Sequence, residues 1–573
     1  MSPSSGLPPW ADALRNRYIQ GESSQFLLYG NVRDVYPFEQ DGVRSYLPLR
    51  AFLEAFFSRT REITAYYNCA EGIGFQDEMH AKRFVRASNA RRLLRGEPEI
   101  AGLPTRPRDA LQLLGDLVTD RSQTAAAIID YAEMIVPTGR VVGDADRANL
   151  VTLQRWASDP SLQSSKNLVL MITEHRADLH KRIVAQPQLA QIRLLLPTQD
   201  ERLAYLESLD LADLTLLLSL KDLARKTAGL NLVQIRGMLR RAAAFGWEIN
   251  DRVVSSEKKA IIERECAGLV EFVDPGHDFS AVGGLERIKT DLMRMAEAIR
   301  NGPATIVPMG VLFVGPMGTG KTFVAEAFAA ESGLTCMKFK NFRDKYVGET
   351  EANLEKILDI VEGLGQVLLI IDEADRAFSV GPGDAGSSSR VIARLKEFMS
   401  DTSHRGDVVV IMMTNRPDKI DTDLKRAGRL DQKIPFFYPD NDVERGAILK
   451  ALIRKNKLSL GEGVTVEGIA ASAGPTDNSP WGYSGAELES VLLAAARMAA
   501  HDGKAEITQA LLERALTDVI PSRDTRMLRF MELQAVVEAS SREMLPERYR
   551  TAETSALHAE IDELKRVLGE RLR

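Results

Sequence analysis

Cysteine is scarce in this sequence: Cys69, Cys266 and Cys336 are the only three in 573 residues. They lie far apart and form no CxxC pair. This excludes a small secreted domain held together by disulfides and a zinc site built on cysteine pairs. The sequence therefore predicts reduced thiols in a cytoplasmic protein.

Long apolar runs are also missing. A membrane-spanning helix needs about 18 consecutive apolar residues, and no stretch comes near this length. Residues 1–9 lack the basic region and the apolar core of a signal peptide. We expect no membrane partner, and we expect residues 1–12 to form a disordered tail.

Aromatic residues make up 6% of the chain, and the net charge is −6. Neither favours nucleic acid, because single-strand binding combines basic grooves with aromatic stacking. Residues 82–108 are locally basic, but Phe84 is their only aromatic residue. We interpret this segment as a solvated helix face and loop, and a nucleic-acid motor remains a weaker alternative. The basic residues of the segment are Lys82, Arg83, Arg86, Arg91, Arg92, Arg95, Arg106 and Arg108.

The clearest motif present is the glycine-rich stretch from Gly315 to Thr322. It follows an apolar strand pattern at 311–314 and opens a helical pattern at 323–331. A strand, a glycine loop and a helix in this order predict a phosphate site, with backbone N–H groups around the phosphates. Lys321 can reach the β- and γ-phosphates, and the Thr322 hydroxyl can hold Mg²⁺.

Two further strand patterns end in polar residues. The apolar run 367–371 delivers Asp372 and Glu373, and the run 408–413 delivers Thr414 and Asn415. We predict that Asp372 holds Mg²⁺ and that Glu373 polarises the attacking water. Asn415 is expected beside the γ-phosphate.

Arg426 and Arg429 lie three residues apart, next to a glycine turn. Such a pair suits an arginine finger offered to the nucleotide of another subunit. We predict that these two arginines act together with Lys321, Glu373 and Asn415 in catalysis.

The same strand-end pattern occurs earlier in the chain at a nearly fixed spacing. Asp130 lies 242 residues before Asp372, and Thr173 lies 241 residues before Thr414. This long-period repeat predicts a duplicated domain whose first copy has lost its working residues. Tyr131 stands in place of Glu373 in that copy. The loop 68–74, after the strand pattern 62–67, lies where a phosphate loop could be, but it has no Lys followed by Ser or Thr, so we expect no nucleotide binding there.

Taken together, the motifs at 279–285, 315–322, 345–349, 370–373, 414–415, 426–429 and 483–486 resemble the AAA branch of the AAA+ ATPases. The whole chain is similar to bacterial, cyanobacterial and plastid AAA ATPases in which a nucleotide-dead module precedes an active one. This resemblance implies ATP and Mg²⁺ as ligands, a homo-oligomeric ring that is a hexamer, and arginine fingers acting in trans. It further implies a pore loop at Tyr346, Val347 and Gly348 that grips a protein client, and a second pore loop at 383–389. The implied nucleotide contacts are Gly283, Gly284, Gly315, Pro316, Met317, Gly318, Thr319, Gly320, Lys321, Thr322, Phe323, Asp372, Gly485 and Ala486.

The predicted fold class is α/β, with two tandem modules that each combine a helix-flanked parallel sheet with a small helical lid. A helical tail closes the chain, and its leucine stripe suits either a packed helix or a coiled coil. The stripe contains Leu557, Ile561, Leu564, Leu568 and Leu572. The predicted domains are a tail at 1–12, a degenerate module at 13–205 with its lid at 206–250, a helical linker at 251–277, an active module at 278–440 with its lid at 441–517, and a helical extension at 518–573.

Two functions remain open at this stage. The first is an ATP-driven remodeller of protein clients that pulls on them through Tyr346 and Val347. The second is a nucleotide-switched scaffold in which the degenerate module docks partners without threading. A protease is disfavoured, because the sequence contains no HExxH motif.

Overall fold

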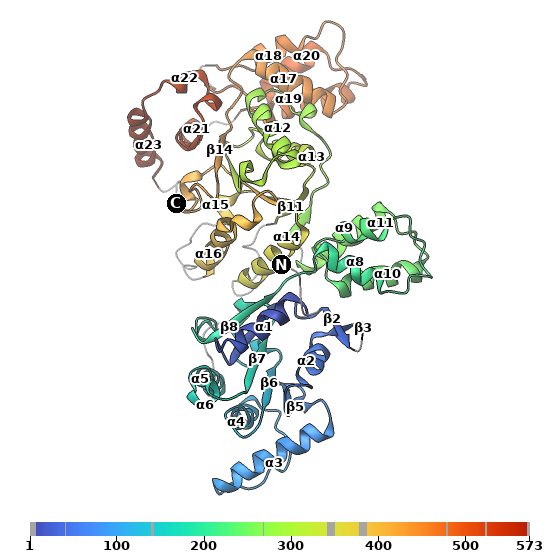
Figure 1. Ribbon diagram of the computed structural model, residues 1–573. Coiled ribbons are helices and arrows are strands. Elements are labelled where there is room, and N and C mark those ends of the chain that lie inside the picture. The colour runs from blue at the N-terminus through green and yellow to red at the C-terminus, as the bar shows by residue number, and fades with distance from the viewer. Residues whose placement is uncertain are drawn as a thin grey trace. The chain divides into compact units, whose positions relative to one another are not determined.

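The computed structural model describes residues 7–40, 42–138, 143–266, 269–340, 350–377, 387–476, 480–521 and 524–569. These residues form two compact units. The first unit contains the chain up to 264 together with α14 (Thr350–Leu364), and the second contains the rest (Figure 1).

The first unit is built on a six-stranded sheet. Its central strands are buried at every position, as expected for strands covered by helices on both faces. All neighbours pair in parallel except the edge strand β5, which pairs antiparallel with β4. In sheet order the strands are β5 (Gly72–Phe75), β4 (Ile63–Asn68), β6 (Ala125–Ile129), β7 (Leu168–Ile172), β1 (Gln25–Gly30) and β8 (Leu189–Leu194), and a separate hairpin contains β2 (Val35–Gln40) and β3 (Val43–Pro48).

Helices of the first unit bury apolar residues against this sheet and continue into a small helical domain. The helices that accompany the sheet are α1 (Pro9–Ile19), α2 (Leu49–Phe57), α3 (Glu78–Leu94), α4 (Pro107–Val118), α5 (Asp144–Ser158), α6 (Pro160–Gln163) and α7 (Lys181–Val184). The helical domain contains α8 (Gln199–Glu207), α9 (Leu220–Lys226), α10 (Leu232–Phe245) and α11 (Asp251–Glu265).

The second unit has a sheet with the same arrangement. Its order is β14 (Gln432–Pro435), β10 (Gly310–Val314), β13 (Val408–Thr414), β12 (Val367–Ile371), β11 (Thr335–Phe339) and β9 (Val270–Phe272), with only β9 antiparallel to its neighbour. The helices beside this sheet are α12 (Glu286–Asn301), α13 (Lys321–Ser332), α15 (Ala374–Ala377) and α16 (Ser387–Ser400), and the lid contains α17 (Asp442–Lys455), α18 (Val466–Ser472), α19 (Gly485–His501) and α20 (Gln509–Asp518).

The C-terminal extension folds back on its own unit (Figure 1). It contains α21 (Thr525–Glu538), α22 (Glu547–Arg550) and α23 (Thr554–Leu568). Ile561 and Leu568 of the leucine stripe are buried in a cluster with residues of α21, and Leu557 and Leu564 are partly buried against it. Within the described residues this stripe is therefore a packed helix face.

The two sheets match strand for strand. β1 lies between β7 and β8, just as β10 lies between β13 and β14. The lids match as well. Arg202 and Arg445 are both buried, and each donates to the carbonyl oxygen of the preceding proline, Pro197 or Pro439. The duplication predicted from the spacing of strand ends is therefore visible in topology and in side-chain contacts.

Three local expectations need correction. The predicted linker at 251–277 is helical only through α11, because Val270–Phe272 forms the edge strand β9. The predicted tail at 1–12 overlaps α1, which begins at Pro9. The loop at 68–74 does not occupy the phosphate-loop place, because it follows β4, whose counterpart is β11; the counterpart of the phosphate-loop strand is β1.

Candidate functional site

The phosphate loop leaves the buried strand β10 at Gly315 and enters α13 at Lys321. Gly315, Gly318 and Gly320 have φ angles of 149°, 78° and 87°, which other residues rarely adopt. A Cβ atom at Gly315 would lie 2.1 Å from the carbonyl oxygen of Phe436. The loop therefore needs these glycines, and it ends at a helix amino terminus, where free N–H groups favour a phosphate.

Lys321 lies between the phosphate loop and the end of β13. Its Nζ donates to the carbonyl oxygens of Gly315 (2.9 Å) and Pro316 (2.8 Å) and to Oδ1 of Asn415 (2.8 Å). Burial lowers the pKa of Lys321 to about 8, and the carboxylate of Asp372 acts in the opposite direction. A phosphate next to this ammonium group would favour its charged form further.

The residues expected to hold Mg²⁺ meet at the end of β12. The Thr322 hydroxyl donates to Oδ2 of Asp372 at 3.2 Å, so that a hydroxyl and a carboxylate face one place. Oxygen ligands of this kind suit Mg²⁺. Lys338 Nζ contacts the same Asp372 oxygen at 3.1 Å and supplies a positive charge there. Sequence reasoning missed Lys338, although a lysine near the end of an apolar strand was an available signal.

Glu373 has a strained backbone with a φ of 47°. Such a conformation costs a non-glycine residue about 1–3 kcal/mol and occurs preferentially at functional sites. Its N–H donates to Oδ1 of Asp372 at 2.9 Å. The Glu373 side chain is 53% exposed and pairs with Arg376 at 2.9 Å, so that water has access to its carboxylate.

Gly283 and Gly485, two of the nucleotide contacts that the resemblance implies, both lie beside Ile448 of the lid. A Cβ atom at Gly283 would lie 2.3 Å from the carbonyl oxygen of Ala447, which explains a glycine there. The Ala486 N–H donates to the carbonyl oxygen of Gly318 at 3.2 Å and joins the lid to the phosphate loop. His277, which sequence reasoning missed, stacks on Phe323 with ring centroids 3.8 Å apart.

The remaining contacts of the prediction are placed as follows. Gly284 has a positive φ and packs beside Ile448, and Gly485 is the first residue of α19. Met317 is 51% exposed. Tyr346, Val347 and Gly348, as well as residues 383–386 of the second predicted pore loop at 383–389, lie outside the described residues.

The two predicted finger arginines differ in their surroundings. Arg429 is held by two hydrogen bonds of 2.7 Å, from Nε to the Ser400 hydroxyl and from Nη1 to the carbonyl oxygen of Asp423. Arg426 has a side chain that is 75% exposed and pairs with Asp423 at 3.1 Å. Arg426 is thus the one that projects into solvent, while Arg429 stabilises the turn.

In the first module an arginine occupies the corresponding strand ends. Arg33 follows β1, and its guanidinium lies 3.0 Å from Oδ2 of Asp130 and 3.2 Å from Oε1 of Glu174. The guanidinium also covers the ring of Tyr131 at 3.9 Å. Tyr131 has the same backbone conformation as Glu373, with a φ of 52°. Its N–H donates a hydrogen bond of 2.9 Å to Oδ1 of Asp130, as the N–H of Glu373 does to Asp372. The first module thus keeps the strand-end geometry and fills it with its own cation.

The lid of the first module is fixed in a similar way. Asp34 is buried, and its carboxylate accepts hydrogen bonds of 3.1 Å from the N–H groups of Leu232 and Val233 at the start of α10. In the second module the corresponding helix α19 meets the phosphate loop itself. A side chain of the loop after β1 therefore replaces a contact that the phosphate loop makes in the second module.

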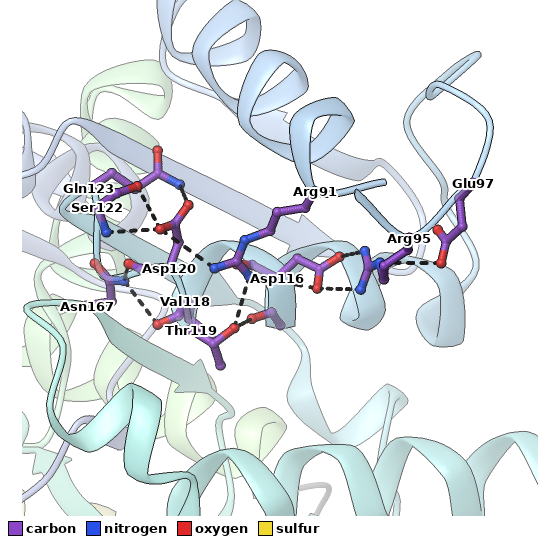
Figure 2. Close-up of polar contacts among 11 residues, drawn as sticks. Arg91, Arg95, Glu97, Asp116, Val118, Thr119, Asp120, Ser122, Gln123 and Asn167 are labelled. Atoms are coloured by element: carbon purple, nitrogen blue, oxygen red, sulfur yellow. Dashed lines mark hydrogen bonds and ion pairs between the residues drawn. The ribbon is translucent and has the colours of Figure 1, made fainter. Parts of the chain in front are cut away.

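Two arginines of the basic segment 82–108, Arg91 and Arg95, are paired with neighbouring acids, as Figure 2 shows. Arg95 pairs with Asp116 through hydrogen bonds that include one of 3.0 Å, and it lies 3.4 Å from Glu97. Arg91 donates to the Thr119 hydroxyl at 3.2 Å and lies 3.6 Å from Asp120. These contacts support a structural role for Arg91 and Arg95 rather than a role in binding phosphate groups.

Domain models of known families match three parts of the chain. Residues 2–194 match the N-terminal Rossmann-like domain of AAA+ chaperones, and residues 200–267 match the second helical domain of AAA+ chaperones. Residues 311–438 match the ATPase family associated with various cellular activities, AAA. Together these models cover most of the chain.

Curated relatives are similar over about half of the chain. The ATP-dependent zinc metalloprotease FtsH 3 of Sphaerobacter thermophilus is 34% identical over 274 residues, which are 46% of this chain and 54% of that protein. The ATP-dependent zinc metalloprotease FtsH of Akkermansia muciniphila is 31% identical over 52% of this chain and 34% of its own length. The uncharacterized AAA domain-containing protein ycf46 of Guillardia theta is 28% identical over 55% of this chain and 62% of its own length.

The chain thus spans between 34% and 62% of the length of these relatives. Among the described residues, no helix combines the length and the apolar character needed to cross a membrane. The matched domains, the duplicated sheet and the phosphate loop agree with one another. The chain belongs to the AAA+ ATPases, with an AAA module that follows the Rossmann-like and helical domains of the AAA+ chaperones.

Proposed function

We propose that this protein hydrolyses ATP to ADP and phosphate in its second module and uses the energy to remodel or unfold a protein client. The observation that supports this most is the convergence of Lys321, Thr322, Asp372, Glu373 and Asn415 at the ends of three adjacent strands. Residues of these types at these positions supply the charge, the metal ligands and the water-orienting groups of phosphoryl transfer.

Each residue has a distinct task in this proposal. Lys321, held by the loop carbonyl oxygens, neutralises charge on the phosphates. Thr322 and Asp372 would hold Mg²⁺. When bound, this ion would compensate the negative charge that develops on the phosphate oxygens. Glu373 accepts hydrogen bonds from the attacking water, and Asn415 orients the same water.

The proposed assembly is a ring of six copies, with each nucleotide site at a boundary between subunits. Arg426 supports this arrangement because its guanidinium is exposed and its neighbours hold the turn that carries it. An arginine of this kind adds positive charge to the transition state of a neighbouring site. The ring and the transfer in trans are parts of the proposal.

The proposed grip on the client is the loop with Tyr346 and Val347. An aromatic residue followed by an aliphatic one can hold an extended polypeptide without sequence preference. The alternative is a nucleotide-switched scaffold in which the first module docks partners. It is supported by the internal ion pairs of Arg33, which make a nucleotide unnecessary for the folding of that module.

The experiment compares two variants in a capture assay. Glu373→Gln should keep ATP bound and lower the hydrolysis rate by about a hundredfold or more, since general-base catalysis typically contributes that much. Proteins that copurify with Glu373→Gln are identified by mass spectrometry. They are compared with the proteins that copurify with the double variant Glu373→Gln, Tyr346→Ala. Glu506→Gln, a change of an exposed carboxylate in the lid, is the matched control and should hydrolyse ATP at the normal rate.

A protein retained only when Tyr346 is present would support remodelling through the loop and identify the client. The same partners in both variants would refute the grip and favour the scaffold. Normal hydrolysis by Glu373→Gln would refute the assigned active site itself.

A further inference from the structure

The C-terminal extension reaches the turn that carries Arg426. Glu538 is the last residue of α21, and its carboxylate is bound by two ammonium groups. One is Lys425, directly before Arg426, and the other is Lys433 of β14 at 3.1 Å. The side chains of Glu538 and Lys425 are only 15% and 12% exposed, so that this pair is shielded from water.

Lys425 is also fixed on its other side. Its Nζ donates to the carbonyl oxygen of Pro417 at 3.0 Å, just after the strand end that delivers Asn415. Two residues beyond Glu538, the N–H of Ser540 donates to the carbonyl oxygen of Lys433 at 3.0 Å. The extension therefore attaches to β14 through the backbone and to the finger turn through a side chain.

The same helix also contacts the lid of its unit. Glu532 of α21 is 3% exposed and accepts a hydrogen bond of 3.0 Å from the indole N–H of Trp481. Arg416, next to Asn415, places its guanidinium 5.3 Å from the ring of Phe530 on α21. One helix thus touches the lid, a strand end of the nucleotide site and the finger turn.

From this geometry we propose that Glu538 is a positioning residue for the arginine finger: through Lys425 it holds the turn from which Arg426 projects. Loss of the Glu538 carboxylate leaves two ammonium groups close together without a counter-charge. Because Lys425 is shielded, it must move outward to regain hydration, and the backbone of Arg426 moves with it. The inference rests on the proposed role of Arg426 in trans.

The kinetic test is the variant Glu538→Gln, with Glu538→Ala as a second variant. The hydrolysis rate constant kcat should fall by between about tenfold and a hundredfold, as expected when a catalytic group is displaced by about 1 Å. The KM for ATP should stay within about twofold, because the site in the same subunit is untouched. Glu547→Ala, a change of an exposed carboxylate on the same extension, is the matched control and should keep the normal kcat.

A mixing experiment separates positioning from a general loss of structure. Glu538→Gln subunits have an intact site of their own but a displaced finger, whereas Glu373→Gln subunits have an intact finger and an inactive site. Mixed before assembly with an excess of Glu373→Gln, each Glu538→Gln subunit should regain at least half of the normal rate. Arg426→Ala subunits, mixed in the same way, show whether fingers act in trans at all.

Rescue of both Glu538→Gln and Arg426→Ala supports the inference. Rescue of Arg426→Ala without rescue of Glu538→Gln overturns it and leaves the proposed function intact. Failure to rescue Arg426→Ala refutes the finger in trans, and the positioning role falls with it. An unchanged kcat in both Glu538 variants also overturns the inference.

Discussion

Arg33 provides a direct test of how the first module is stabilised without a nucleotide. The change Arg33→Met keeps much of the side-chain volume and removes the guanidinium. Asp130 and Glu174 then lose their counter-charge, and Tyr131 loses its cation contact. We expect the first unit to be destabilised.

The expected loss of stability follows from how exposed the side chains of Arg33 and its two acidic partners are. The side chains of Arg33, Asp130 and Glu174 are 34%, 27% and 46% exposed, so that solvent screens both ion pairs. Each such pair contributes about 0.5 kcal/mol. The cation contact with Tyr131 adds about 0.5–1 kcal/mol. The expected loss is about 1.5–2 kcal/mol, which lowers the Tm of a unit of this size by about 3–8 °C.

Scanning calorimetry of Arg33→Met, Asp130→Asn and the double variant measures the coupling between the two groups. We expect an interaction energy of about 0.5 kcal/mol or more between Arg33 and Asp130. Arg147→Met removes a guanidinium whose partner Asp144 is fully exposed, and it should shift the Tm by less than 1 °C. Strict additivity, together with a Tm equal to that of the unchanged protein, would refute a stabilising role for Arg33.

The remaining predictions concern the thiols, a partly buried lysine and the lid of the first module. In the native protein at pH 8, iodoacetamide should add one label, at the exposed Cys69, because Cys266 and Cys336 are buried and burial raises the pKa of Cys336 to about 12. A second label added equally fast in intact-mass spectra would contradict this. Burial lowers the pKa of Lys258 from 10.5 to about 8. Below pH 8 the charged lysine therefore lowers the free energy of unfolding, and this loss of stability disappears as the pH rises from 8 toward 10.5. Lys258→Met should therefore raise the Tm at pH 7 by a few degrees, and this advantage should shrink at pH 10. Asp34→Ala should lower the free energy of unfolding of the first unit by about 1 kcal/mol, as the loss of a helix cap does. Asp34→Asn should lose less stability than Asp34→Ala, and calorimetry of both variants measures the difference.

The strands and the glycine loop of the candidate nucleotide site were predictable because their sequence signals are local. Gly315 to Thr322 stand between a strand and a helix that are contiguous in sequence, and Asp372 with Glu373 directly follow an apolar run. Such patterns contain their own structural context. The structure adds the contacts between them, among them the bond from Lys321 to Asn415, which crosses 94 residues.

The first module shows what the sequence could not indicate. Arg33 meets Asp130 and Glu174 across 97 and 141 residues, and nothing near Arg33 marks it as the counterpart of a phosphate loop. The strand pattern at 62–67 is more conspicuous in the sequence than the short apolar run at 26–30. The counterpart of the phosphate loop was therefore expected after the strand at 62–67, whereas it follows β1. Only the order of strands in the sheet identifies β1 as the equivalent of β10.

The matching strand ends of the two modules suggest a physical reason for the single working site per chain that we propose. In the second module the charge opposite Asp372 and Asn415 comes from Lys321 and Lys338, together with ligands that bind and leave. In the first module Arg33 supplies this charge permanently, because a guanidinium does not lose its proton in proteins and cannot dissociate from the chain. Asp34 likewise holds α10 where the phosphate loop meets the lid in the second module. A module with built-in charge and a built-in lid contact needs no ligand at these positions, so it is suited to a constant part in the hydrolysis cycle that we propose for the second module.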